Sequence, residues 1–568
     1  MHPPTIESPV SEPLRQPISR RASPKSSRLF SRFDSRPGDK LALITLVAVI
    51  VYASVRSLCE AVTRPLWFDE LCTWIMVQQH PLSILWNALK DGMDGQPPLF
   101  YLLERPVAAA IANEQISYRL LSILGLACTV ACLFHLIRKR SGNLNALFCA
   151  AIPLVTLLYD PYAVEARPYT LVVACLAIAL VCYDRAPDPR WMLLMGISLA
   201  LAEALHYYAI LAMAPLILAE MALTVRIRRP RWAVWAALSS SLIPLAAFWP
   251  LLSSLKAHYG AHLWALPSLE GAEWSYGWFF RTTTNRGMGL AAAGALAVLV
   301  SMLAAERAAS REEAHEDMLF HQRVLALGFL ALPFLSVFAA KLAHGGMTER
   351  YMLPTILGFP LAAGYSLPRW GRRSAPVLAA LGLCIIVPLA SQERRFWSSY
   401  HGDFVSPAKD VEAMVASANY PELPVVVSEP HDFLQLVHYA SPGWAGRFFL
   451  VLDAPQAVVY SGSDSADKEY EAMRSYAPLQ IYDFAPFVAE HPVFLLYSGN
   501  GGAGFDWWPP RLLRDGYTLR PVAVRDIYHR VFFVSRGLVS RGASADVKTA
   551  GASAPVRASN GSIAPKSR

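Results

Sequence analysis

The chain has 568 residues, of which 54% are hydrophobic and only 17% are charged, and its mean hydropathy is +0.31. Apolar runs of roughly 16–22 residues recur along it, which is more apolar surface than one water-soluble core can bury, so an ordinary soluble protein is excluded. The net charge of +8 does not indicate nucleic acid binding, because the Lys and Arg residues gather in short loops beside the apolar runs. We therefore expect an all-α polytopic membrane protein.

The first 39 residues are rich in Ser, Pro and Arg and show no apolar periodicity. Such a composition is typical of a disordered segment, and its arginines favour the cytoplasmic side. A cleaved signal peptide is not expected, because the first apolar run begins too far from the start and is about 20 residues long. We interpret residues 1–39 as a disordered cytoplasmic tail.

The apolar runs predict about eleven transmembrane helices within residues 40–392. The stretch 96–112 is left out, because counting it would move the basic clusters 138–140 and 226–231 to the outer face, against the positive-inside rule. Its Pro97-Pro98 start also suits a juxtamembrane helix. The expected spans are 41–61, 117–137, 144–159, 168–184, 190–205, 206–226, 232–252, 287–305, 322–343, 351–367 and 375–391.

This topology places the basic loops 138–140, 185–190, 226–231 and 369–373 inside. The loops 62–116, 160–167, 253–286 and 344–350 then lie outside, and so does everything after residue 392. Outer loop 1, residues 62–116, is therefore extracytoplasmic.

The C-terminal part has a different pattern. Short strand-like runs at 424–430, 447–453, 492–498 and 531–536 alternate with helix-like stretches at 407–418, 431–440 and 467–480. We expect a small soluble periplasmic α/β domain over 393–540. Residues 541–568, rich in Ser, Ala and Gly, are expected to be a disordered tail.

Two adjacent carboxylates, Asp69 and Glu70, stand in outer loop 1 among Trp67, Phe68 and Trp74. A carboxylate beside aromatic rings loses hydration, which raises its pKa and keeps it basic enough to take a proton from a hydroxyl. The alternative is that polar residues at span ends only meet lipid headgroups and water. The pairing of two acids among aromatics favours a general base.

Three further side chains are expected at the same outer level. Arg167, beside Pro168 in "EARPYTL", and Arg350, in "MTERYMLPTI", each begin a span, where a guanidinium can hold a lipid phosphate or merely snorkel to headgroups. His206, in "EALHYYAI", is a hydrogen-bonding group, an interfacial residue or, least favoured, a metal ligand.

The cysteines and acids do not define a metal site or a cofactor. One His with scattered Asp and Glu residues gives no ligand spacing, so no metal ligands are predicted and no cofactor is certain, while a divalent metal stays an open alternative. Cys59 and Cys72 flank the start of outer loop 1, and a disulfide between them is a further alternative.

Five motifs carry a family resemblance over roughly residues 40–392: "WFDE", "DGQPPLFYLL", "EARPYTL", "LHYYA" and "ERYMLP". In their order and placement the chain resembles the GT-C superfamily of membrane glycosyltransferases. The similar branch includes the bacterial lipid A arabinosyl- and galacturonosyltransferases and the protein O-mannosyltransferases. The expected arrangement is a GT-C type transmembrane domain followed by the α/β domain.

The resemblance implies transfer of a sugar, with inversion, from a polyprenyl-phosphate carrier to a hydroxyl of a glycan, lipid or protein acceptor. The implied location is the bacterial cytoplasmic (inner) membrane with the active site facing the periplasm, and the implied partners are these substrates and membrane lipids, with no nucleic acid. The arabinosyltransferases tend to have Lys where this chain has Gln96, which puts the donor sugar in doubt. The implied residues are Asp69 as base with Glu70 as its neighbour in substrate positioning, Arg167, Arg350 and His206 at the donor phosphate, and Asp94, Gln96, Tyr169 and Tyr351 at the substrates.

Two other functional classes remain alternatives. A transporter or flippase of lipid-linked glycans would also use outer arginines, but it should carry charged residues at mid-bilayer along a path, and the expected spans are nearly free of them. A non-catalytic membrane scaffold would need no acid pair among aromatics. The sequence favours the enzyme.

Overall fold

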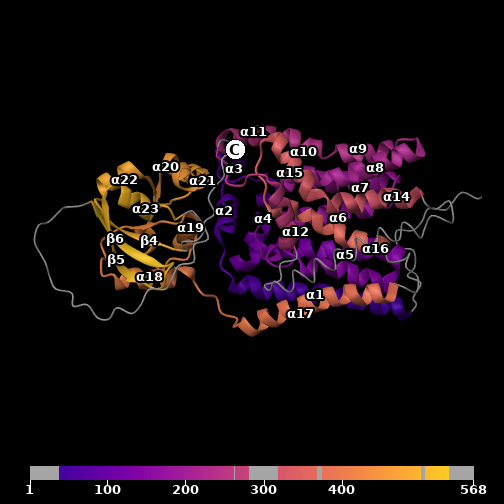
Figure 1. The fold of residues 1–568 in the computed structure, drawn as a ribbon, viewed down its shortest axis with the longest axis horizontal. Helices are drawn as coiled ribbons and strands as arrows, with labels where there is room; N and C mark the ends of the chain where they lie inside the picture. Colours follow the sequence, from indigo (N-terminus) through magenta and orange to yellow (C-terminus); the bar gives the residue numbers. More distant parts are fainter. Residues whose placement is uncertain (1–36, 261, 280–316, 367–373, 500–505, 537–568) are drawn as a thin grey trace, which may run out of the picture.

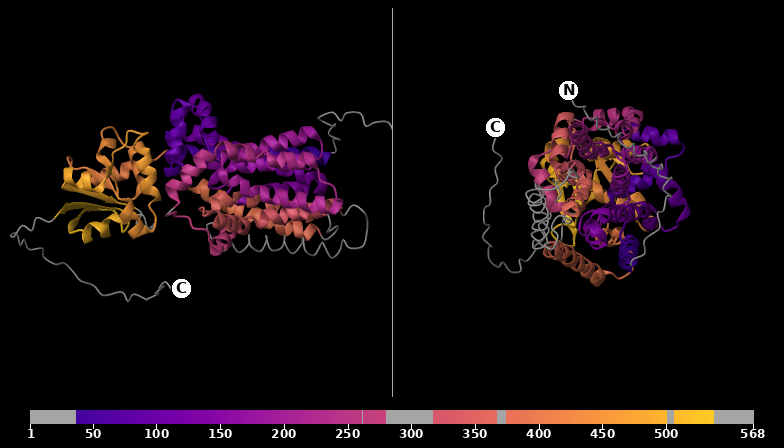
Figure 2. Two further views of the ribbon diagram at one scale, coloured as in Figure 1. Left: turned by 90° about the horizontal axis from the view of Figure 1, so that it is seen from above. Right: turned by 90° about the vertical axis from the view of Figure 1, so that its right-hand side faces the viewer.

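The computed structural model describes residues 37–260, 262–279, 317–366, 374–499 and 506–536. Its helices form an elongated bundle, and a smaller α/β unit lies against one end of that bundle (Figure 1). The view from above shows the same separation (Figure 2, left). The span expected at 287–305, the basic loop at 369–373, and most of both predicted tails lie outside the described residues.

Four of the expected spans are single helices. They are α1 (Pro37–Thr63), α6 (Tyr169–Tyr183), α7 (Pro189–Leu205) and α17 (Ser374–Ser399). Judged by length and hydropathy, the described residues contain four helices able to cross a membrane, or six if each of two bent pairs counts as one span. This confirms a multi-helix membrane architecture, although the described helices do not by themselves reach the predicted number of about eleven spans.

Several expected spans are interrupted. α5 (Glu114–Ala151) contains the span expected at 117–137 and the first half of the next, with a break at Gly142, whose φ of 76° is readily adopted by glycine. Two other expected spans, 206–226 and 351–367, each begin as a 3-10 helix and continue as an α-helix. These pairs are η3 (Tyr207–Met213) with α8 (Ala214–Ile227), and η4 (Glu349–Leu357) with α16 (Gly358–Ser366).

Two further spans are sharply bent. The helices α9 (Trp232–Ser239) and α10 (Leu242–Ala247) meet α11 (Trp249–Tyr259) at 60°, and α14 (Asp317–Leu330) meets α15 (Leu332–Ala343) at 63°. A proline in the first turn of the second helix marks each bend, at Pro250 and Pro333. Proline has no N–H to continue the hydrogen-bond ladder, which explains why the bends fall there.

Outer loop 1 folds into three short helices, α2 (Phe68–Val77), α3 (Leu82–Lys90) and α4 (Leu99–Ala110). α4 is the helix formed by the stretch 96–112. Its 12 residues extend about 18 Å, well short of a hydrocarbon core of about 30 Å, which supports its exclusion from the spans. In Figure 1, α2 and α3 lie between the bundle and the α/β unit.

The α/β unit contains a six-stranded sheet in the order β3-β2-β1-β4-β6-β5. β3, β2, β1 and β4 run parallel, and β6 and β5 are antiparallel additions. The four expected strands are present as β1 (Val425–Val427), β2 (Phe448–Leu452), β4 (Val493–Ser498) and β6 (Arg530–Arg536). The sequence did not predict β3 (Ile481–Asp483), which has only three residues, or the edge strand β5 (Tyr517–Val524), which contains Pro521.

Helices cover both faces of this sheet. The parallel strands are joined by helical crossovers, which is how a parallel sheet buries both of its faces. α17 continues to Ser399, past the boundary expected at 392, so the α/β unit starts with the loop before its first helix. The helices are α18 (Pro407–Ser417), α19 (Pro430–His438), η6 (Ala445–Arg447), α20 (Ala454–Ser461), α21 (Ser465–Met473), α22 (Phe484–Glu490) and α23 (Trp508–Arg514).

The α/β unit is docked on outer loop 1. The backbone N–H of Leu66 donates to the hydroxyl of Tyr439 at 2.8 Å, and Gln435 Nε2 donates to the carbonyl of Leu66 at 2.9 Å. His438 Nε2 lies 3.0 Å from Glu114 at the start of α5. These contacts bring α19 beside α2, which carries the acid pair.

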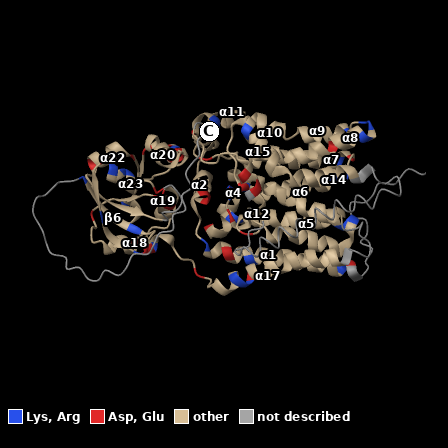
Figure 3. Ribbon diagram, viewed as in Figure 1, with Lys and Arg blue, Asp and Glu red and all other residues tan. Residues whose placement is uncertain are grey.

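Charged residues gather at the two ends of the bundle, and the middle of the helices is nearly free of them (Figure 3). Lys and Arg are prominent at the end opposite the α/β unit, near the end of α8. This distribution agrees with a bundle whose apolar middle lies in the bilayer and whose basic end faces inside.

Candidate active site

The acid pair begins α2, where negative charge is favoured by the helix dipole. Successive side chains on an α-helix point about 100° apart, so two adjacent acids must face different surroundings. Asp69 and Glu70 do so in this structure, and their partners differ completely.

Glu70 faces inward and is fully buried against Arg119 of α5. Arg119 Nε and Nη2 donate to its two oxygens at 2.7 and 2.6 Å, and the backbone N–H of Ala166 donates to Oε1 at 2.8 Å. Arg119 also donates to the backbone carbonyls of Ala61, near the end of α1, and of Arg64 and Pro65 in the loop before α2. Burial by itself would raise the pKa of Glu70, but Arg119 holds that pKa below its usual value. Glu70 therefore fastens outer loop 1 to the bundle and is not presented to a substrate.

Asp69 faces two arginines from distant parts of the chain. Arg350 Nη1 donates to Oδ2, and Arg167 Nη2 lies 3.4 Å from Oδ1. Burial by itself would raise the pKa of Asp69, but the two guanidinium groups lower it below the ordinary value. The expected rise in this pKa is therefore wrong, because the sequence could not show that two cations flank the carboxylate.

Arg167 links Asp69 to Asp94. Its Nη1 donates to Asp94 Oδ2 at 2.6 Å, and both side chains are at least 94% buried. Arg167 precedes the Pro168 cap of α6, and its carbonyl accepts from Ser122 Oγ at 2.9 Å, which fixes the backbone there. A planar guanidinium held by two carboxylates keeps a defined orientation.

Aromatic side chains line the bundle side of this charge cluster. The ring of His206 lies 5.4 Å from that of Tyr169 and 5.0 Å from that of Tyr351, and Tyr351 stacks on Tyr208 at 4.3 Å. His206 Nδ1 accepts from the backbone N–H of Tyr208 at 3.2 Å, which leaves Nε2 to carry the ring proton. The structure thus brings His206, Tyr169 and Tyr351 together, as the motifs predicted.

Gln96 and Glu165 are buried polar groups near the cluster. Gln96 follows Asp94 by two residues, and its Oε1 has no hydrogen-bond partner among the described residues. Burial raises the pKa of Glu165 to about 7, and Arg64 Nη2 lies 4.0 Å from its Oε1. Unsatisfied buried polar atoms are costly, so such groups commonly meet a ligand or water.

Residues of the α/β unit also reach α2, which the sequence did not reveal. Glu469 Oε1 accepts from Cys72 Sγ at 3.4 Å, and the His431 ring lies 4.8 Å from that of Phe68. Arg119 was missed too, although an Arg inside an apolar run is a signal that should have marked it. Glu469 lies in the polar stretch "SADKEYEAM" and carried no such signal.

The thiols and acids form neither a disulfide nor a metal centre here. Cys59 and Cys72 are both free, so the disulfide considered from the sequence is wrong. In the described ranges, no group of three or more His, Cys, Asp or Glu side chains is arranged to hold a metal ion.

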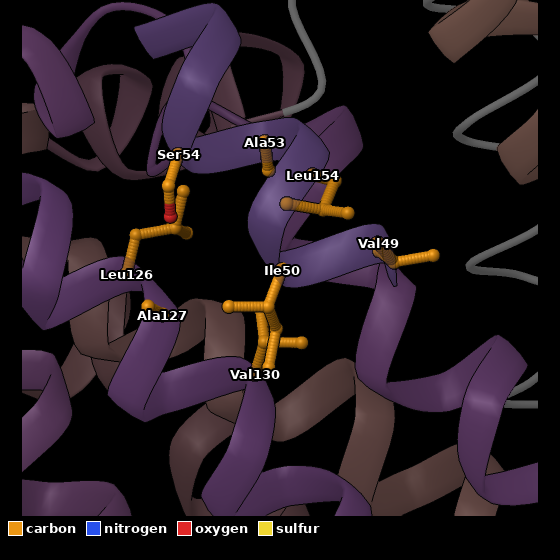
Figure 4. A pocket seen from close by; sticks show the side chains of 8 residues that line it. All are labelled: Val49, Ile50, Ala53, Ser54, Leu126, Ala127, Val130 and Leu154. Carbon is orange, nitrogen blue, oxygen red and sulfur yellow. The ribbon is translucent and has the colours of Figure 1, made fainter. Parts of the chain in front are cut away.

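A small depression on the surface of the bundle is apolar, unlike the charged site around Asp69 (Figure 4). It lies between α1 and α5, and its lining contains no charged side chain, so it suits hydrocarbon and not a phosphate. The lining residues are Val49, Ile50, Ala53, Ser54, Leu126, Ala127, Val130 and Leu154.

Comparisons with known proteins agree with this architecture. A family model described as dolichyl-phosphate-mannose-protein mannosyltransferase matches residues 95–253. The structure is similar to ArnT from Cupriavidus metallidurans in the apo state, with a TM-score of 0.54 and 14% identity over 87% of this chain and 98% of that one. It is also similar to the same ArnT bound to undecaprenyl phosphate, with a TM-score of 0.51 and 14% identity over 88% and 99% of the two chains.

None of the curated proteins compared with the sequence is a significant match. At 14% identity the likeness to ArnT shows the fold, and the family model adds a match of sequence in the same part of the chain. Together they confirm the resemblance to the GT-C superfamily of membrane glycosyltransferases.

Proposed function

We propose that the chain transfers a sugar from a polyprenyl-phosphate donor to an acceptor hydroxyl at the outer face of the bacterial cytoplasmic membrane. The observation that carries the proposal is Asp69 held between Arg167 and Arg350 at the end of the helical bundle. A proton acceptor next to two cations is what a sugar transfer with a phosphate leaving group requires.

A lipid-linked donor follows from the location. Nucleotide sugars are cytoplasmic, so a site at the outer end of the bundle needs a donor that the membrane itself presents. The similar ArnT structure contains undecaprenyl phosphate, which supports a phosphate of this class here. Arg167 and Arg350 can each donate two hydrogen bonds to phosphate oxygens.

Each of these residues has a separate role in the proposed reaction. Asp69 accepts the proton of the acceptor hydroxyl while that oxygen bonds to the anomeric carbon from the side opposite the phosphate. The bond from the anomeric carbon to the phosphate oxygen breaks with its electron pair going to the phosphate, whose charge Arg167 and Arg350 stabilise. The product is inverted at the anomeric carbon, and Asp94 keeps Arg167 oriented.

Donor binding and base strength are coupled in this arrangement. Asp69 occupies the two guanidinium groups that the donor phosphate needs, so the phosphate must compete with Asp69 for them. Once the phosphate takes part of their hydrogen bonding, the pKa of Asp69 rises towards its ordinary value. Asp69 therefore becomes a stronger base when the donor is present.

The remaining sequence-predicted residues take supporting roles in the proposal. His206, Tyr169 and Tyr351 form the aromatic side of the donor site, and Gln96 offers its unpartnered Oε1 to a substrate hydroxyl. Glu70 acts through loop structure and not through the substrate, which revises the positioning role expected for it.

The proposed orientation can be checked with reporter fusions. A fusion after Arg140 or Arg229 is expected to report the cytoplasm and a fusion after Arg395 the outside, because the basic clusters favour the inner face. A cytoplasmic signal from the α/β unit would contradict the outward-facing site.

The donor site can be tested by binding of undecaprenyl phosphate to the purified protein. Arg350→Lys keeps the charge but loses the planar fork, so we expect binding weaker by about 1–3 kcal/mol, roughly 5- to 150-fold. Arg394→Lys, at an exposed position of α17, is the matched control and should bind normally. Failure of the wild-type protein to bind this lipid, or to transfer sugar from extracted donor lipid to an envelope extract, would refute the proposed function.

A further inference from the structure

The α/β unit places one carboxyl group, that of Glu469, beside the acid of α2. Glu469 Oε1 accepts from Cys72 Sγ at 3.4 Å, and Cys72 stands three residues after Asp69 on α2. Residues three apart on a helix are surface neighbours, with about 5–6 Å between their Cβ atoms. Glu469 therefore lies on the side of α2 that carries Asp69, and the two carboxyl groups interact electrostatically.

The neighbouring residue holds Glu469 in place. Tyr470 is fully buried, its ring lies 5.7 Å from that of Phe68, and its hydroxyl donates to the carbonyl of Pro430. α21 is thus anchored both to α2 and to the start of α19. Such double anchoring limits the freedom of the Glu469 side chain.

Burial and the neighbouring charges set the protonation of this carboxyl. Asp69, Asp94 and Glu469 share the site with the guanidinium groups of Arg167 and Arg350 and with the ring of His431, whose pKa is raised. Burial, followed by repulsion from Asp94 and Asp69, raises the pKa of Glu469 to about 8. At neutral pH Glu469 is therefore protonated and can both donate and accept a hydrogen bond.

Charged and titratable groups from several elements interact with Glu469. They are Cys72 and Asp69 on α2, Asp94 after α3, Arg167 before α6, Tyr259 on α11 and His431 on α19.

Glu469 and the donor arginines approach Asp69 from different parts of the fold. Arg167 and Arg350 come from the ends of bundle helices, whereas Glu469 comes from the α/β unit at the outer end of the bundle (Figure 1). In a displacement with inversion the nucleophile and the leaving group lie on opposite sides of the anomeric carbon. The acceptor is therefore expected on the Glu469 side.

We propose that Glu469 is a positioning residue that hydrogen-bonds the acceptor and orients its hydroxyl towards Asp69. The inference rests on the proposed transferase function, and it assigns to the α/β unit a direct part in the reaction site. Glu469 takes no proton in the transfer itself, so Asp69 remains the base.

Kinetics of two variants test this role. The probes are undecaprenyl phosphate for the donor side and, for the acceptor side, the envelope extract of cells that lack the protein. Glu469→Ala is expected to raise the half-saturating amount of extract about three- to tenfold, because the variant loses one hydrogen bond to the acceptor. The same variant is expected to bind undecaprenyl phosphate as the wild-type protein does. Glu471→Ala, exposed on the same helix, should change neither value.

The pH profile separates positioning from a merely structural role. As pH rises through about 8, Glu469 ionises and loses its donor hydrogen, so wild-type transfer should fall on the alkaline side. Glu469→Gln keeps a neutral hydrogen-bond donor at every pH, so its transfer at pH 7 should be near normal and the alkaline fall should disappear.

Three results would overturn the inference. An unchanged half-saturating amount for Glu469→Ala would show that the acceptor does not meet this residue, and weaker undecaprenyl phosphate binding would move Glu469 to the donor side. Persistence of the alkaline fall in Glu469→Gln would also count against it. Failure of the wild-type protein to bind the lipid or transfer sugar would instead refute the proposed function, so the two failures are distinguishable.

Discussion

Replacement of Asp69 by Asn is expected to lower the rate of sugar transfer about 10²–10⁴-fold, the range typical for loss of general-base assistance. Asn keeps the size of the side chain and can still accept a hydrogen bond, but it cannot take the proton of the acceptor hydroxyl. The measurement is the initial rate of transfer from extracted donor lipid to the envelope extract. Asp403→Asn, at an exposed position between the bundle and the α/β unit, serves as the control.

The Asp69→Asn variant should also bind undecaprenyl phosphate more tightly than the wild-type protein. The substituted amide carries no charge, so Arg350 and Arg167 lose their shared anionic partner and become available to the phosphate. Tighter binding together with lost transfer would be hard to reconcile with misfolding. Normal transfer by the purified variant would remove Asp69 as the base.

Glu70→Gln should destabilise the folded protein by roughly 3–5 kcal/mol, the cost typical of removing one partner of a buried ion pair. The substitution removes the negative charge that compensates Arg119, and both side chains are fully buried. The expected readout is a lower thermal unfolding midpoint in detergent. Glu490→Gln, exposed at the end of α22, should leave the midpoint unchanged.

The remaining folded Glu70→Gln protein should bind undecaprenyl phosphate normally and transfer sugar far better than the Asp69→Asn variant. A normal unfolding midpoint combined with a loss of transfer as large as that of Asp69→Asn would contradict the structural role. It would mean that the two acids share the chemistry.

Much of the fold could be predicted from the sequence because its signals are local. The apolar runs of α1, α6 and α7 follow from composition alone, and the strands β1, β2, β4 and β6 from short β-branched and aromatic runs. The bends before α11 and α15 depend on single prolines, Pro250 and Pro333. These prolines lie in apolar runs whose composition still predicts an unbroken span. β5 has exposed side chains and a proline, so no local pattern marked it as a strand.

The candidate site was predicted in part for the same reason. Asp69, Arg167, His206 and Arg350 each stand at the outer end of an apolar run, and the topology places those ends at one level. The motifs of the GT-C resemblance added Asp94, Tyr169 and Tyr351. A shared depth in the membrane does not determine which of these side chains are in contact.

By itself, the sequence determined that the chain is a membrane protein, where its main helices and strands lie, and which polar residues gather at one end of the bundle. Only the tertiary structure decided their pairing: Glu70 is directed to Arg119, Asp69 to Arg167 and Arg350, and Glu469 is brought from nearly 400 residues away to the Asp69 helix. The physical reason is that hydropathy and helix periodicity are local properties of the chain. The charge state of a buried carboxyl depends instead on which cations surround it, and those come from distant segments.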